Sequence, residues 1–399
     1  MTTKTASTWQ LVKLSEIADV RDGTHATPKK LAFGKPLITS KQLKQGEVMD
    51  TDYFISEDDY EEVNRRSRVD VNDVLITMIG TVGDTVFVKE KPNFAIKNIG
   101  LIKNSDPILG RFIYYWLNSP AGKHEIRKRL RGTSQGFISL GGLRDLDVLL
   151  PDADSQLTIV EALSFYDDLI EINNKRVRLL EGVISKIYTG WFSQSNDWNK
   201  VKLSECISIS RGKSYTGKDL EDSEDSIPLV NLKCINRYGG FRKDGLKTFS
   251  GKYKESHIVR KGDMVMAVTD MTQERMIIAR SARVPSLGTD FGVISMDLVK
   301  IEPKENCDRD FLYAYLRWSD FADNVKNYAN GANVLHLLPD RVSEYEILLP
   351  PLELQKKFSL VVKDMFEQID VLELACDNLK KTRDLLIPQL VTGKLAIKS

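Results

Sequence analysis

Basic and aromatic side chains alternate in one stretch of the second half of the chain, residues 233–254. The stretch holds seven basic residues against the single acid Asp244, with four aromatic residues between them. Basic side chains neutralise phosphates and aromatic rings pack on sugars or bases, so the pattern indicates a nucleic-acid contact. A solvated surface hairpin around Gly239 and Gly240 is the competing interpretation. The DNA contacts predicted in this half are Arg211, Lys213, Ser214, Tyr215, Arg242, Lys243, Lys247, Arg275 and Asn333.

The first half offers three further groups of candidate contacts. Residues 20–30 form a turn-rich polar stretch, a basic helix is expected over 120–131, and the loop 132–136 follows it. A glutamine can read adenine through two hydrogen bonds, and a serine can serve either phosphate or base. Each residue taken singly is also an ordinary surface residue. The DNA contacts predicted here are Arg21, Thr24, His25, Lys29, Lys30, Arg129, Arg131, Ser134 and Gln135.

Signatures of catalysis are mostly missing from the sequence. It has no Asp/Asn-Pro-Pro-aromatic stretch of an adenine methyltransferase, no GxGxxG and no GxxxxGK[ST] phosphate loop. The four histidines do not have metal-ligand spacing. Asp297 with Glu302-Pro-Lys304 resembles a nuclease D…ExK pattern, but so short a pattern arises easily by chance. We therefore predict no catalytic residue and no metal site, and keep a stand-alone nuclease as a rival hypothesis.

Two long heptad-like stretches must position these candidates. In residues 156–190 the apolar residues recur in steps of three and four, interrupted by Asn173, and residues 354–395 carry the same pattern interrupted by Arg383. Such stripes are typical of coiled-coil helices, in which a polar seam residue often fixes the register. Each stretch follows a Leu-Leu-Pro and ends on Thr-Gly, where Gly190 and Gly393 suit the left-handed position that closes a helix.

The chain is a duplication of a whole domain plus a helix. The motif Trp-x-x-Val-Lys-Leu-Ser-Glu occurs at residues 9–16 and 198–205, and a glutamine stands five residues after each Leu-Leu-Pro, at Gln156 and Gln355. Strands are expected over 73–78, 85–88 and 263–268, and helices over 107–117 and 308–316. The fold class is therefore α+β, with two similar globular domains joined by two long antiparallel helices and related by a pseudo-twofold.

Composition limits the remaining choices. The net charge of +1 gives no global signal for nucleic acid, so the case rests on local patches. The four cysteines are scattered and read as reduced thiols, and no apolar run reaches the ~18 residues of a membrane span. The start of the sequence lacks the apolar core of a signal peptide. We expect a cytoplasmic protein.

Taken together, the paired motifs make the whole chain resemble the specificity subunit of a type I restriction–modification system. The stretches Asp22-Gly-Thr-His-Ala-Thr-Pro28 and Ser210-Arg-Gly-Lys-Ser-Tyr215 also look like loops of that family. The resemblance implies two target recognition domains, residues 1–151 and 192–350, with conserved helices over 152–191 and 351–399. Each domain would read one half of a split DNA target. The resemblance also implies that modification and restriction subunits carry the methyl transfer and cleavage, with S-adenosylmethionine, ATP and Mg²⁺ bound there and no cofactor on this chain.

Apolar residues beyond the seam of the two helices predict a surface for these partners. A two-helix contact cannot cover all of them, and exposed apolar patches mark interfaces. The resemblance implies that modification subunits, expected to be two in number, bind this surface. The predicted partner contacts are Phe165, Leu169, Ile172, Val361 and Phe366. Two other functions stay open: a coiled-coil scaffold for proteins, and a specificity protein of a methylation-only or phage-defence complex.

Overall fold

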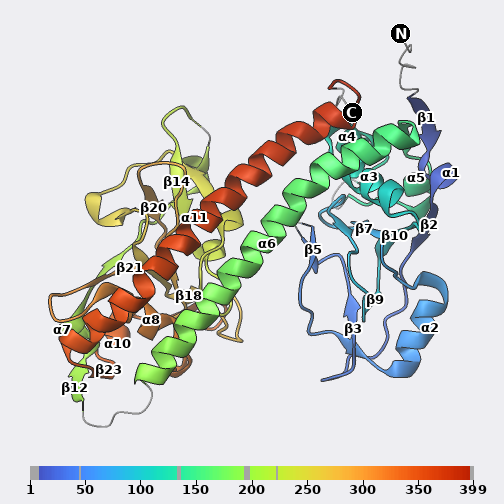
Figure 1. The fold of residues 1–399 in the computed structure, drawn as a ribbon. Helices are drawn as coiled ribbons and strands as arrows, with labels where there is room; N and C mark the ends of the chain where they lie inside the picture. Colours follow the sequence, from blue (N-terminus) through green and yellow to red (C-terminus); the bar gives the residue numbers. More distant parts are fainter. Residues whose placement is uncertain (1–8, 45, 133–135, 193–197, 222, 396–399) are drawn as a thin grey trace. The chain divides into compact units, whose positions relative to one another are not determined.

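The computed structural model describes residues 9–44, 46–132, 136–192, 198–221 and 223–395. The chain divides into two compact units, unit 1 with residues 1–170 and 378–399, and unit 2 with residues 171–377. Two long helices, α6 (Ala153–Phe192) and α11 (Leu352–Leu390), contribute residues to both units (Figure 1). The expected α+β class is confirmed, since each unit combines strands with helices.

Unit 1 is built around a four-stranded antiparallel sheet in the order β2-β10-β7-β8. A smaller sheet, β6-β3-β9, and the two-stranded ribbons β1-β11 and β4-β5 complete it. Its strands are β1 (Gln10–Lys13), β2 (Asp19–Asp22), β3 (Lys35–Ile38), β4 (Leu43–Lys44), β5 (Glu47–Val48), β6 (Phe54–Ile55), β7 (Val74–Thr77), β8 (Thr85–Phe87), β9 (Ala95–Ile96), β10 (Ile99–Lys103) and β11 (Asp147–Leu150). Its short helices are α1 (Leu14–Ile17), α2 (Glu57–Ser67), α3 (Pro107–Asn118), α4 (Pro120–Lys128) and α5 (Leu140–Arg144).

Unit 2 repeats this plan with a sheet in the order β13-β21-β17-β19 and a second sheet in the order β15-β14-β20-β16. Its strands are β12 (Asn199–Lys202), β13 (Ile207–Arg211), β14 (Ile227–Val230), β15 (Lys247–Phe249), β16 (Ile258–Val259), β17 (Met264–Ala267), β18 (Thr269–Asp270), β19 (Ser281–Arg283), β20 (Gly292–Ile294), β21 (Leu298–Pro303), β22 (Leu335–His336) and β23 (Glu346–Leu349). Its helices are α7 (Leu203–Cys206), α8 (Arg309–Trp318), α9 (Phe321–Val325), α10 (Pro339–Ser343) and the 3₁₀ turns η1 (Gly217–Leu220), η2 (Leu232–Cys234), η3 (Lys243–Gly245), η4 (Glu255–His257) and η5 (Lys326–Tyr328).

The duplication is visible in the strand pairing. The ribbon β1-β11 corresponds to β12-β23, both antiparallel over four residue pairs. The parallel pair β3-β9 corresponds to the parallel pair β14-β20. The expected strands and helices are confirmed at β7, β8, β17, α3 and α8.

The repeated motifs have local structural roles. Glu16 and Glu205 each accept a hydrogen bond from the backbone N–H three residues earlier, at 3.0 and 2.9 Å, which closes the first turn of α1 and α7. Gln156 and Gln355 each donate from Nε2 to the carbonyl of the proline five residues earlier, at 2.8 and 2.7 Å. These contacts satisfy backbone groups at chain reversals, where a buried unpaired group would be costly.

The predicted seams of α6 and α11 are confirmed, because none of their positions is exposed. In unit 1, Leu163 shares an apolar core with Ile387 and Leu390. In unit 2, Ile184 and Tyr188 share a core with Phe358 and Val362. Early residues of one helix thus meet late residues of the other in each unit, so the helices run antiparallel there.

Polar residues in the seam differ in part from the prediction. Asn174, the neighbour of the predicted Asn173, meets α11 with its Oδ1 3.6 Å from Cys376 Sγ. Gly393 has the expected left-handed φ of 69° and follows α11. The prediction for Gly190 is wrong, because α6 continues through it to Phe192. One missing side chain does not stop a helix whose other face is packed.

Two equivalent glycines permit a close backbone crossing after β2 and β13. Gly23 donates to the Ile99 carbonyl at 2.8 Å, and Gly212 donates to the Leu298 carbonyl at 3.1 Å. A Cβ at Gly23 would lie 2.5 Å from the Ile96 oxygen, and one at Gly212 would lie 2.1 Å from the Ser295 oxygen. Only glycine fits such an approach of two backbones.

We therefore expect Gly212→Ala to destabilise unit 2 by roughly 1–3 kcal/mol, because the added methyl group meets a backbone oxygen that cannot rotate away. Gly190→Ala on α6 is the matched control, since nothing lies within 4 Å of its added Cβ, and it should stabilise the helix by up to about 1 kcal/mol. Chemical denaturation of the two variants measures both effects. Equal stability of the two would contradict the crossing.

Candidate nucleic-acid interface

In unit 2, several predicted contacts gather where β13 ends. Arg211 is the last residue of the strand and is exposed. Lys213 forms an isolated parallel β-bridge with Ser295 through the backbone. Ser214 and Tyr215 continue the loop, and the ammonium group of Lys247 lies 5.4 Å from the centre of the Tyr215 ring. We call residues 211–216 with Lys247 the β13 cluster. It offers cations and an aromatic ring on one frame, which suits phosphate and sugar contacts.

The surroundings of the β13 cluster add positive charge. The pKa of His257 is lowered by its burial and, after that, by the charges of Lys213 and Lys254. The backbone N–H of Lys254 donates to His257 Nδ1 at 3.1 Å. A neutral His257 leaves the local potential to the two lysines, which favours an anionic ligand.

The corresponding stretch of unit 1, after β2, is polar but more internally paired. Nδ1 of His25 lies 2.8 Å from Asn98 Oδ1, and its Nε2 lies 2.9 Å from Asp22 Oδ2. The Arg21 guanidinium donates to Asp19 at 2.8 Å, and Lys30 pairs with Asp52 at 2.6 Å. Thr24 forms a parallel backbone β-bridge with Lys97, which is equivalent to the bridge between Lys213 and Ser295. Lys29 is exposed. The two stretches therefore share a backbone frame and differ in side chains.

A second pair of equivalent loops lies at 131–137 and 330–336. Arg131 and Phe137 exchange two backbone hydrogen bonds of 2.8 and 2.9 Å, and Asn330 and His336 exchange two of 3.0 and 2.9 Å. Arg131 and Asn333 are exposed on these loops. The predicted contacts Ser134 and Gln135 lie outside the described residues.

Arg275 belongs to a loop that braces loop 330–336. The buried carboxylate of Asp270 accepts from the Thr272 and Ile277 backbone N–H groups at 2.8 and 2.9 Å, which closes the loop. Gln273 Nε2 then donates to the Ala332 carbonyl at 2.8 Å. Arg275 and Asn333 are thereby held on neighbouring loops.

Three other predicted contacts have their charges paired with acidic side chains of the protein. The Arg129 side chain is only 15% exposed and pairs with Glu125 at 2.5 Å and Asp147 at 2.9 Å. Arg242 is held by Asp244, through Nε at 3.0 Å, and Lys243 pairs with Asp377 of α11. Composition alone cannot distinguish such structural pairs from free cations.

The same face of α11 carries a buried acid between two paired ones. Asp370 pairs with Lys261 at 3.0 Å and Asp377 pairs with Lys243. Burial raises the pKa of Glu373 to about 7. Part of the basic stretch 233–254 thus binds the helix, which the sequence did not indicate.

Some contributing residues escaped the sequence analysis. Asn98 and Lys97 meet the loop after β2 from β9, and Gln273 and Lys254 support the two regions of unit 2. The left-handed φ of 54° at Asn98 marks its special position, but that angle has no sequence signal of its own. These residues are brought in by long-range strand pairing.

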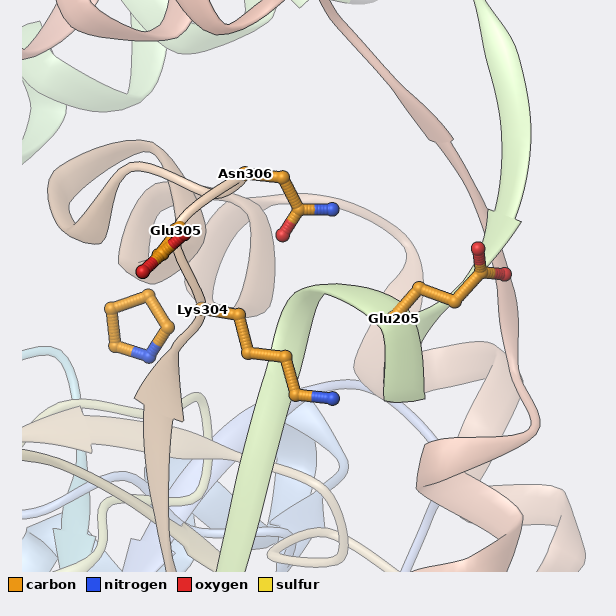
Figure 2. Close-up of a pocket in the computed structure, with 5 residues that line it drawn as sticks. Glu205, Lys304, Glu305 and Asn306 are labelled. Atoms are coloured by element: carbon orange, nitrogen blue, oxygen red, sulfur yellow. The ribbon is translucent and has the colours of Figure 1, made fainter.

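Neither a pocket nor an acidic pair supports catalysis. Figure 2 shows an open depression of about 550 Å³ lined by Glu205, Pro303, Lys304, Glu305 and Asn306, none of which is a predicted contact. Asp297 lies in the turn before β21 and Glu302 is the fifth residue of that strand, so the strand carries their backbones apart by up to ~16 Å, which does not favour a shared metal. Among the described residues, no three His, Cys, Asp or Glu side chains gather to bind a metal.

Two successive segments of the chain, residues 6–181 and 195–376, match the family described as Type I restriction modification DNA specificity domain. The chain belongs to this family. It is thus the DNA target recognition subunit of a type I restriction–modification system, and not the methyltransferase or endonuclease subunit. The resemblance stated from the sequence is confirmed. Among the described residues, no helix has the length and apolarity needed to cross a membrane.

Similar proteins are named as specificity subunits of type I restriction enzymes. The chain is 22% identical over 424 residues to the Type I restriction enzyme MjaIX specificity subunit of Methanocaldococcus jannaschii, covering 98% of this chain and 94% of the relative. It is 29% identical to the EcoBI specificity subunit of Escherichia coli over 138 residues, 32% of this chain and 29% of the relative. The crystal structure of the S subunit from M. genitalium shares the fold, with a TM-score of 0.53, 15% identity and coverage of 100% and 99% of the two chains.

We expect different effects on DNA binding from replacing an exposed cation and from replacing a cation that is paired with an acid. The plot of log affinity against log salt has a negative slope. Arg211→Gln should reduce the magnitude of this slope by roughly 0.9, if Arg211 neutralises one phosphate. Lys243→Ala should leave that slope unchanged and cost about 1 kcal/mol of stability, because its partner is Asp377. Binding to one duplex at several salt concentrations, with denaturation curves, measures both.

Asp377→Ala is the matched control for the internal pair, and it should reproduce the stability loss of Lys243→Ala. If Lys243→Ala changed the salt slope and Arg211→Gln did not, the assignment of the two residues would be reversed.

Proposed function

We propose that each recognition domain of this subunit reads one half of a bipartite DNA target. The observation that supports this most is the pair of equivalent glycine crossings, at Gly23 and Gly212, which hold loops of unlike side chains on one backbone frame. A constant frame with divergent loops suits two readers of different sequences. The proposed domains are residues 1–151 and 192–350, with helices at 152–191 and 351–399 acting as spacer.

The proposed DNA contacts fall into three groups of unequal strength. The β13 cluster is the best supported, because its cations and ring are held together. The loops that carry Arg131, Arg275 and Asn333 come second. In the stretch after β2 the contacts are His25, Thr24 and Lys29 first, since Arg21 and Lys30 would have to leave acidic partners.

The proposed partners dock on the long helices. Phe165 and Ile172 on α6 are 61% and 54% exposed, and Val361 on α11 is also exposed. Leu169 is half-buried beside them. The prediction for Phe366 is wrong, because it is 4% exposed and packs on Tyr313 with ring centres 5.7 Å apart. We place two modification subunits on this surface, with restriction subunits in the same cytoplasmic complex.

The cofactors of the reaction belong to those partners in this proposal. S-adenosylmethionine would bind the modification subunits, and ATP and Mg²⁺ the other subunits, because the chain lacks the phosphate-binding loops that such ligands need. The contribution of this chain is to place the partners on the right sequence.

Exchanging residues 18–150 for the matching segment of a relative should change one half of the methylated target and leave the other half unchanged. Base contacts are local to each domain, while the helices carry no sequence information. The measurement is a genome-wide map of methylated bases in cells that carry the complete system. The reciprocal exchange, residues 207–349, is the control and should alter only the other half. A change of both halves in either chimaera would contradict two independent readers.

Lengthening both helices together should lengthen the unread gap between the half-sites. We insert four residues after Asn174 in α6 and four after Ala375 in α11, which keeps the antiparallel pairing on both sides. Four residues add ~6 Å and rotate the far residues by about 40°. One added base pair turns the duplex by about 35°, close to the rotation, and two add ~7 Å, close to the length, so we expect the preferred gap to grow by one or two base pairs.

The readout is methylation of a library of sites with identical halves and varied gaps. Insertion into α6 alone is the control and should abolish activity, because it offsets every seam contact on one side by ~6 Å. An active doubly lengthened protein with the original optimal gap would refute the spacer.

A further inference from the structure

An ion pair in the seam of unit 1 has an apolar counterpart in unit 2. Arg383 Nη1 lies 2.6 Å from Asp167 Oδ1, and the Tyr115 hydroxyl donates to Asp167 Oδ2 at 2.6 Å. The Arg383 and Asp167 side chains are only 22% and 15% exposed. When Gln156 is aligned with Gln355, Asp167 corresponds to Phe366 and Ile184 corresponds to Arg383.

The counterpart residues lie together in the core of unit 2. Ile184 and Phe366 are 0% and 4% exposed and belong to one apolar cluster. The neighbouring layers are apolar in both units, with Leu163 and Ile387 in one and Tyr188 and Val362 in the other. The charged layer is therefore a place where the two ends of the seam differ in chemistry.

This difference decides which helices can pair. Two copies of α6 in the same antiparallel register would set Asp167 of one copy against Ile184 of the other. Two copies of α11 would set Arg383 against Phe366. Each arrangement removes the partner of a largely buried charge on the facing helix. Arg383 keeps only Asp384 of its own helix and Asp167 keeps only the Tyr115 hydroxyl. We expect this to disfavour the arrangement by on the order of 100-fold for each mismatch. Pairing α6 with α11 avoids both mismatches.

We propose that Asp167, Arg383, Ile184 and Phe366 form a recognition code that pairs α6 with α11 and excludes pairing of like helices. The consequence for DNA rests on the proposed function. A dimer through two copies of α6 would combine two first domains and would read one half-site as an inverted repeat. Pairing of α6 with α11 therefore combines the two different recognition domains in one subunit.

Exchanging residues between the layers tests the code without changing composition. In the double variant I184R/R383I, α6·α11 pairing has two mismatches. Two copies of α6 then gain an arginine opposite Asp167, and two copies of α11 gain an apolar residue opposite Phe366. The variant D167F/F366D has the same effect. The quadruple variant with all four changes restores complementary α6·α11 layers, with the ion pair moved to unit 2.

The measurement is self-association of the full-length chain by sedimentation, without DNA. We expect the dissociation constant of each double variant to fall about 100-fold or more below that of the wild type, and the quadruple variant to return to the wild-type value. Double variants that are folded and associate no more than the wild type would overturn the code.

A second measurement keeps the test decisive if the double variants do not fold. A quadruple variant that recovers the wild-type melting temperature and mass then supports complementarity of the layers, and one that also fails to fold overturns it. The proposed function is tested separately, with the associated double variant and a library of split sites. Association without a preference for inverted half-sites would count against two independent readers while leaving the code intact.

Discussion

The apolar seam between α6 and α11 is the constraint on which the rest of the structure depends. Each helix carries a narrow stripe that it cannot bury alone, and each unit takes one end of both helices into its core. Ile387, Leu390 and Val391, near the end of the described chain, complete the core of unit 1. The first domain therefore reaches its final packing only after the last helix has been made, and the two halves are coupled in folding although their recognition loops are separate.

The most recognisable repeats of the sequence serve this scaffold and not the ligand. Glu16 and Glu205 close short helices, Gln156 and Gln355 satisfy proline carbonyls, and Gly23 and Gly212 permit the crossing behind the recognition loops. Repetition preserves what both copies need, which is backbone geometry. Side chains can differ where the two copies keep the same backbone, as Thr24 and Lys213 illustrate at equivalent bridges.

Local periodicity predicted the elements well, while contacts set by distant partners escaped it. The seams, the hairpin β7-β8 and the helices α3 and α8 follow from patterns within a few residues. The exposure predicted for Phe366 is wrong, and the ion pairs of Arg129 and Lys243 were not expected, because Tyr313, Asp147 and Asp377 are distant in sequence. A basic or apolar residue on a helix or hairpin has the same local signature whether it meets solvent or another element, so its role depends on tertiary structure.

The basic residues of unit 2 divide into those paired with acids of the helix α11 and those near the β13 cluster. A chain of net charge +1 has little long-range attraction for DNA, so binding must depend on a few cations left free by the scaffold. In unit 2 the acids of α11 engage Lys243 and Lys261, while Lys213 and Lys254 act together on His257 beside the β13 cluster. Internal pairing thus engages Lys243 of the basic stretch and leaves Lys254 close to His257. In our proposal, few phosphate contacts keep non-specific affinity low, and discrimination between sequences falls to the loops that the glycine crossings hold in place.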